Sequence, residues 1–111
     1  MKIRKLYREV NPELLYDEIR DFILKQGVSL GEAKIETYAL PGDTSSFITR
    51  GTLTFSEDKT GKECIRAHIV GSAKSETKVM LDVNEELFLP EKVTALQEDL
   101  DFIFSSNEIK S

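Results

Sequence analysis

The sequence predicts an α+β domain with the element order β-α-β-β-β-β-α, in which two helices pack on one face of an antiparallel sheet. Two observations predict this class. One segment near each end of the chain repeats its apolar residues at helical spacing, and the stretch between them alternates apolar and polar residues between turn signals. The 111 residues suffice for one core. We therefore expect a single domain over residues 1–104, followed by a frayed polar tail over residues 105–111.

Residues 3–10 predict the first strand, since Ile, Tyr and Val favour strands and the charged residues among them suit an edge position. The first helix begins at Asn11-Pro12-Glu13. Asn can cap the free N–H groups, Pro needs no hydrogen bond at the first helical position, and Glu complements the positive end of the helix dipole. The helix is expected to end at Gly27, and its apolar residues recur at helical spacing: Leu15, Ile19, Phe22 and Ile23.

Four further strands are expected, at residues 33–40, 46–56, 62–71 and 76–86. Three turn signals separate them, namely Pro41-Gly42-Asp43, the loop of residues 57–61 and the short connection of residues 72–75. Pro90-Glu91 then begins a second helix. Its apolar residues recur on one face of a 3.6-residue period: Val93, Leu96, Leu100 and Ile103.

The alternation assigns the strand residues to two faces of the sheet. If the hairpins are centred on their loops, antiparallel pairing sets Leu53, Ile65 and Leu81 in one cross-strand row and Gly51, Ala67 and Val79 in the next. We expect the helices to cover this face, with the small Gly51 and Ala67 allowing a close approach. The other face is expected to meet water and carries the residues of opposite parity: Arg50, Thr52, Thr54, Cys64, Arg66, His68, Lys78, Met80 and Asp82.

Charge and cysteine content exclude some classes of function. The net charge of −5 and the pI near 4.9 disfavour non-specific binding to nucleic acids or anionic membranes, because both reward a surplus of Lys and Arg. No apolar run approaches the roughly 20 residues that span a bilayer. Cys64 is the only cysteine, so no intrachain disulfide can form, as is typical of a reducing compartment. We expect a cytoplasmic protein with neither a membrane nor a nucleic-acid partner.

The water-facing side of the sheet suggests one candidate site. The expected pairing sets Arg50, His68 and Lys78 side by side across three strands, with Arg66 one step along. Like charges placed opposite each other are destabilising without a partner, so these residues predict a shallow site for an anion or an acidic peptide. The alternative is that Glu9, the acidic helix residues or solvent screening offsets the four side chains.

The end of the second helix suggests another candidate. One helix cannot bury Phe102, Ile103 and Phe104 on the same side, so Phe102 or Phe104 is expected to flank the apolar stripe or to be exposed. An exposed aromatic residue there would suit a contact with a partner or a second copy in a homodimer. Packing at the edge of the core is the alternative.

No pattern in the chain predicts catalysis. Cys64 and His68 share a strand and a face, but four strand residues separate their Cα atoms by roughly 13 Å, too far for a nucleophile and its base. One His, one Cys and scattered carboxylates have no recognised metal-ligand spacing, so no metal and no cofactor is expected. An enzyme would require a pocket that gathers residues from several elements: Tyr7, Tyr16, Tyr38, Arg50, Arg66 or Asp82.

The order of elements resembles the START-like helix-grip superfamily, which includes the pollen-allergen-like and polyketide-cyclase-like proteins. The resemblance rests on the opening strand of residues 3–10, the helix start of residues 11–19, the run of antiparallel strands and the amphipathic closing helix. It implies a curved sheet that grips the C-terminal helix, with a hydrophobic ligand held between them. This chain has fewer strands and a closing helix of about four turns, and no signature residue matches.

The sequence therefore favours a non-catalytic binding domain and leaves two functions open. In the first, a small hydrophobic ligand lies between the sheet and the C-terminal helix, next to Leu53, Ile65, Val79 and Leu81. In the second, the chain contacts an acidic protein partner or its own second copy through the outer sheet face or the C-terminal aromatic residues. A cavity of about 300 Å³ or more would favour the first function, and a filled core would favour the second.

Overall fold

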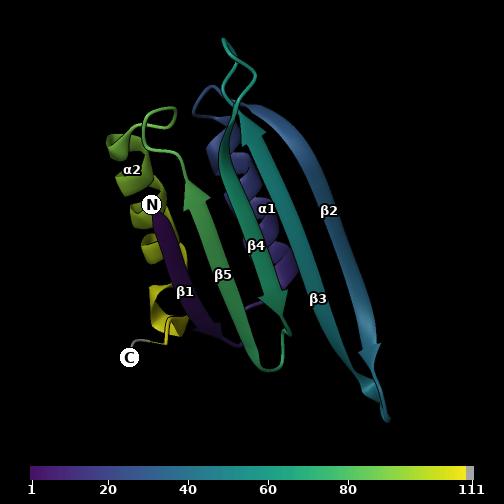
Figure 1. Ribbon diagram of the computed structural model, residues 1–111. Coiled ribbons are helices and arrows are strands. Elements are labelled where there is room, and N and C mark those ends of the chain that lie inside the picture. Colours follow the sequence, from purple (N-terminus) through teal and green to yellow (C-terminus); the bar gives the residue numbers. More distant parts are fainter. Residues whose placement is uncertain (110–111) are drawn as a thin grey trace.

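Five antiparallel strands form one sheet with the order β1-β5-β4-β3-β2, and two helices accompany it (Figure 1). The computed structural model describes residues 1–109, apart from the side chains of residues 43–45. The sequence prediction of the α+β class and of the order β-α-β-β-β-β-α is confirmed. The elements are β1 (Lys2–Arg8), α1 (Pro12–Leu24), β2 (Ser29–Leu40), β3 (Asp43–Ser56), β4 (Glu63–Gly71), β5 (Glu76–Val83), α2 (Pro90–Phe104) and a 3-10 turn (Ser105–Asn107).

Both helices lie against the same face of the sheet, which we call the inner face (Figure 1). α1 packs on β3 and β4, and its start follows the predicted chemistry, because the Asn11 side chain accepts a hydrogen bond of 2.9 Å from the Glu13 N–H. Gly27 has a φ of +86° just past the helix, as a helix-terminating glycine does. The apolar faces of the two helices and of the sheet form one continuous core.

Gly51 brings α1 close to the sheet, as predicted. A Cβ atom built on Gly51 would lie 2.6 Å from Cδ2 of Tyr16, and Tyr16 is a buried residue of α1. Only a residue without a side chain leaves room for that ring.

β2 and β3 are longer than predicted and extend past the rest of the sheet (Figure 1). β2 begins at Ser29 rather than at residue 33, because a bulge between Leu30 and Ala33 carries the pairing past Gly31. Thr54 supports this bulge by accepting a 2.6 Å hydrogen bond from the Glu32 N–H. At the other end β3 pairs with β4 only from Thr49 onward, so the tip of the β2–β3 ribbon has no neighbour on the β4 side.

The predicted cross-strand rows are wrong by two residues, although the faces are right for the strand residues other than Cys64. Leu53 pairs with Ala67 rather than with Ile65, and Ala67 pairs with Leu81. In the β4–β5 hairpin the turn is centred on Lys74, since the Ser72 N–H donates to the Glu76 carbonyl. A shift of two residues preserves the parity of a strand, so the apolar set still faces the helices: Leu53, Phe55, Ile65, Ala67, Ile69, Val79, Leu81 and Val83.

Cys64 differs from the prediction that it lies on the water-facing side. A register shift between Phe55 and Ser56 leaves Cys64 as an extra residue of β4, because Phe55 pairs with Ile65 and Ser56 pairs with Glu63. Cys64 is 1% exposed and belongs to the core. The bulge breaks the alternation that the prediction assumed.

Residues 105–109 lie along β1 rather than extending away as a frayed tail, and the last two residues of the expected tail, 110 and 111, lie outside the described residues. Glu108 forms a β-bridge with Tyr7, and the Ile109 N–H donates to the Leu6 carbonyl at 2.7 Å. Nδ2 of Asn107 donates to the Arg8 carbonyl at 3.0 Å. The described C-terminal segment therefore partly covers the β1 edge of the sheet.

Candidate functional site: the outer face of the sheet

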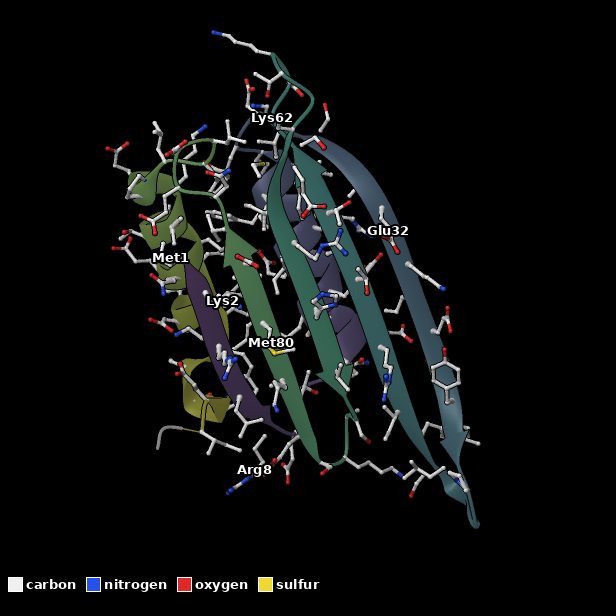
Figure 2. The ribbon with its side chains drawn as sticks, viewed as in Figure 1. Met1, Lys2, Arg8, Glu32, Lys62 and Met80 are labelled. Carbon is white, nitrogen blue, oxygen red and sulfur yellow. The ribbon has the colours of Figure 1, made fainter. Side chains whose placement is uncertain are left out.

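No helix of the described chain covers the second face of the sheet, which we call the outer face (Figure 2). The pairing gives it three cross-strand rows. Each row runs from β1 through β5 and β4 to β3, and β2 continues the sheet with Glu36 opposite Arg50 and Lys34 opposite Thr52. The rows are Leu6, Lys78, Val70 and Arg50; then Arg4, Met80, His68 and Thr52; then Lys2, Asp82, Arg66 and Thr54.

The structure separates the candidate residues that the sequence placed side by side. Arg50 and Lys78 share a row, but Val70 lies between them, and His68 lies in the next row. His68 is half-buried between Thr52 and Met80. Its Nδ1 lies 3.4 Å from Oγ1 of Thr52. The expected run of three adjacent cations is therefore replaced by two cations that flank an apolar residue.

Arg66 already has an anionic partner. Its Nη2 lies 2.9 Å from Oε1 of Glu63, and its Nε donates to the second oxygen of the same carboxylate at 3.3 Å. The carboxylate raises the pKa of Arg66. Asp82 also stands opposite Arg66 in the register. Arg66 is therefore the least available of the four predicted residues for an external anion.

Other cations of the outer face have no such partner. Among the described residues, no ion pair involves Arg4, Arg50 or Lys78. All three are exposed, and each stands directly opposite a half-buried apolar residue: Arg4 opposite Met80, Arg50 opposite Val70, and Lys78 opposite both Leu6 and Val70. Apolar and cationic side chains therefore alternate along the first row, and Arg4 lies in the next row.

The negative charge of the molecule is concentrated on its helices. The two helices carry eight carboxylates and only two cations, a net charge of −6. The whole chain has a net charge of −5, so the rest of the chain has a net charge of +1. The acidic character of the protein therefore comes from the helix layer, and the strands and loops together are close to neutral.

Two hollows adjoin the outer face. The larger, of about 970 Å³, lies where the β2–β3 ribbon passes the β4–β5 turn, and its lining includes Leu6, Ile48, Val70, Lys74 and Lys78. It exists because β3 extends past the end of β4. The smaller, of about 160 Å³, is bordered by Lys2, Arg4, Arg66, His68 and Asp82, among others. Leu53, Ile65 and Val79 line neither hollow, and all three are fully buried in the core.

The two C-terminal aromatic residues have different environments. Phe102 is 89% exposed, and Phe104 is 4% exposed and packs edge to face on Tyr7 with ring centroids 5.8 Å apart. Phe104 therefore belongs to the core edge, and only Phe102 presents its ring to solvent.

The residues considered for an enzyme do not gather in one place. Tyr7 and Tyr16 are buried on the inner side, whereas Arg50, Arg66 and Asp82 lie in two different rows of the outer face. Burial raises the pKa of the Cys64 thiol, which disfavours the thiolate that a nucleophile needs. The described residues contain no group of three or more His, Cys, Asp or Glu side chains that could hold a metal ion.

The sequence alone indicates which face of β1 carries the unpartnered cations, but not which strand β1 pairs with. In β1 the residues Lys2, Arg4 and Leu6 alternate with the inward-facing Ile3 and Tyr7, and this parity assigns Arg4 and Leu6 to the outer face. The contribution of β1 becomes visible only from its pairing with β5, which joins the first strand to the last across 68 residues or more of chain.

Neither helix of the described chain has the length and the hydropathy needed to cross a membrane. Comparisons of this chain with family models, with curated proteins and with solved structures find no match.

Proposed function

We propose that this chain is a non-catalytic binding domain whose outer face holds an acidic, extended segment of a partner protein. One observation carries the proposal: exposed Arg4, Arg50 and Lys78 stand opposite half-buried apolar side chains and have no ion-pair partner among the described residues. An acidic segment with some apolar residues would supply carboxylates to the cations and cover Leu6, Val70 and Met80.

The spacing of the cations favours a peptide over a small anion. Arg4 is on β1 and Arg50 on β3, three strand spacings apart in the sheet order, which corresponds to roughly 14 Å. A single phosphate or carboxylate cannot contact both. A segment of about five extended residues can, since each residue spans roughly 3.3 Å.

The overall charge disfavours a nucleic acid as the occupant. The net charge of −5 repels a polyphosphate chain, and Asp82 and Glu76 stand on β5 among the cations. A short acidic peptide carries less charge and can avoid these carboxylates.

The alternative function, an apolar ligand between the sheet and α2, has less support. The START-like resemblance implies it, and the resemblance remains a hypothesis. Leu53, Ile65, Val79 and Leu81 are each no more than 2% exposed within one packed core, so a ligand there would have to displace core side chains. We also keep the cytoplasm as the proposed compartment, on the basis of the single, buried Cys64.

An NMR titration of the ¹⁵N-labelled protein with a ten-residue peptide of alternating Glu and Leu tests the proposal. We expect shifts at Arg4, Val70 and Lys78, and a dissociation constant about tenfold higher in each of the variants Arg50→Glu and Lys78→Glu. Lys62→Glu is the matched control, because Lys62 lies in the loop at the opposite end of the sheet (Figure 2), and it should leave the affinity unchanged.

Three results would overturn the proposal. The first is a titration without shifts on the outer face. The second is an equal loss of affinity in the control. The third is tighter binding of a single-stranded oligonucleotide than of the peptide at the same salt concentration. Inorganic phosphate is the third probe, and saturation of the same shifts by phosphate alone would assign a small-anion site instead.

A further inference from the structure

The two edges of the sheet are treated differently by the chain. Residues 105–109 lie against the free edge of β1, where the Ile109 N–H donates to the Leu6 carbonyl. β2 forms the opposite edge, and among the described residues only β3 pairs with it. An edge strand with free N–H and C=O groups is a template for another strand.

β2 is long and exposed on both faces. Of its 12 residues only Glu36 is half-buried, and the others are exposed. The described residues expose ten large apolar side chains, and half of them belong to β2 or to the neighbouring part of β3: Leu30, Ile35, Tyr38, Leu40 and Phe47. Apolar surface is therefore concentrated beside the free edge.

We propose that a second copy of this chain pairs with β2 in antiparallel orientation, with the two-fold axis at Ile35, to form a dimer with one continuous sheet. The pairing is isologous, so each contact occurs twice. It places Ile35 opposite Ile35 of the second copy, and Lys34 opposite Glu36 on both sides of the axis.

The charges select this register over its neighbours. In an antiparallel pair, two directly opposite residues either both point their N–H and C=O groups toward the partner strand or both point them away. Neighbouring residues of one strand alternate between these two orientations. A two-fold symmetric pairing must therefore set one residue opposite its own copy. Centring on Lys34 would set Lys34 against itself, and centring on Glu36 would set Glu36 against itself. Like charges directly opposite are destabilising and opposite charges are stabilising. Centring on Ile35 gives two Lys–Glu pairs and an apolar pair on the axis.

The same residues explain why Lys34 does not protect this edge. A lysine on an edge strand usually discourages pairing, because an incoming strand would have to accommodate its charge. Here Nζ of Lys34 already lies 2.8 Å from Oε1 of Glu36, and a second copy brings another such pair with the charges reversed in position. Bulges between Leu30 and Ala33 and between Ala39 and Leu40 confine the regular pairing to residues 33–39.

This dimer leaves the outer face open. The new strands join edge to edge, so neither copy covers Arg4, Arg50 or Lys78 of the other. Failure of the dimer therefore does not affect the proposed peptide site, and failure of the peptide site does not affect the dimer.

Sedimentation velocity over a concentration series tests the proposal with a charge-swap cycle. We expect the wild type to dimerise. Lys34→Glu and Glu36→Lys should each raise the dimer dissociation constant about tenfold or more, because each replaces two opposite-charge pairs by two like-charge pairs. The double variant with both substitutions restores opposite charges across the axis and should recover the dimer.

Phe102→Ser is the control, since it removes the most exposed aromatic ring without touching β2, and it should dimerise like the wild type. Circular dichroism confirms that each variant is folded. A wild type that stays monomeric at millimolar concentration overturns the proposal. So does a dimer that survives both single charge reversals, that is lost in Phe102→Ser, or that the double variant fails to recover.

Discussion

β3 passes through two very different regions of the molecule. Phe55 and Phe47 lie on the same strand and face the same side of the sheet, yet Phe55 is 0% exposed and Phe47 is 50% exposed. Phe55 lies in the covered region, where the helices pack on the sheet. Phe47 lies on the β2–β3 ribbon beyond it. Burial here depends on how far the helix layer reaches.

The lengths of the elements explain the difference. α1 has 13 residues, which at 1.5 Å per residue span about 20 Å. β3 has 14 residues, which at about 3.3 Å per residue span roughly 46 Å. A helix of nearly equal residue count therefore covers less than half of the strand. The ribbon accounts for the elongated shape, whose longest extent is 47 Å.

The largest expected effect compares the two phenylalanines directly. Phe55→Ala should lower the free energy of unfolding by about 3–5 kcal/mol, because it leaves a cavity in a packed core. Phe47→Ala should lower it by about 1 kcal/mol or less, since that ring is half exposed. Urea unfolding followed by circular dichroism measures both. Equal effects would show that the ribbon is packed as firmly as the covered region.

A smaller effect tests how closely the helix layer approaches the sheet. Gly51→Ala should cost about 1–3 kcal/mol, because the new methyl group would lie 2.6 Å from the Tyr16 ring. In a Tyr16→Leu background the same substitution should cost clearly less. Differential scanning calorimetry of the four proteins gives the coupling between the two sites. Additive effects would mean that the ring does not set the constraint.

The smallest effect concerns charge within the helix layer. Glu18 of α1 and Asp99 of α2 approach each other, and the nearby Asp99 carboxyl group, followed by burial, raises the pKa of Glu18. Asp99 Oδ2 is buried without a partner. Glu18→Gln offers this oxygen an amide N–H, and we expect about 1 kcal/mol more stability at pH 7. Thermal unfolding across a pH series measures the gain.

The direction of the pKa shift gives the pH dependence. A carboxyl group whose pKa is raised on folding stabilises the protein below its unfolded pKa, and this contribution is lost as the pH rises through the folded pKa. The advantage of Glu18→Gln should therefore shrink as the pH falls through the acidic range, where Glu18 itself becomes protonated. Glu98→Gln, at an exposed position of α2, is the control. A gain that is independent of pH would contradict this explanation.

Much of the fold could be predicted from the sequence because its signals are local. Asn11-Pro12 predicts the start of α1, and the alternation in β4 and β5 predicts which residues face the core. The register could not be predicted, since it depends on turn geometry and on the extra residue Cys64 in β4. The prediction of the candidate site depended on the predicted register. His68 was therefore predicted to lie beside Arg50, and it instead lies one row away.

The sequence by itself determined the two faces of the sheet, because parity along a strand is local and survives a register shift of two residues. It also determined that carboxylates gather on the helices. Only the tertiary structure decided which residues become neighbours, since pairing joins strands that lie far apart in the chain. That is why β1 adds Arg4 to the outer face through β5, and why β2, paired only with β3 among the described residues, ends the sheet as an open edge.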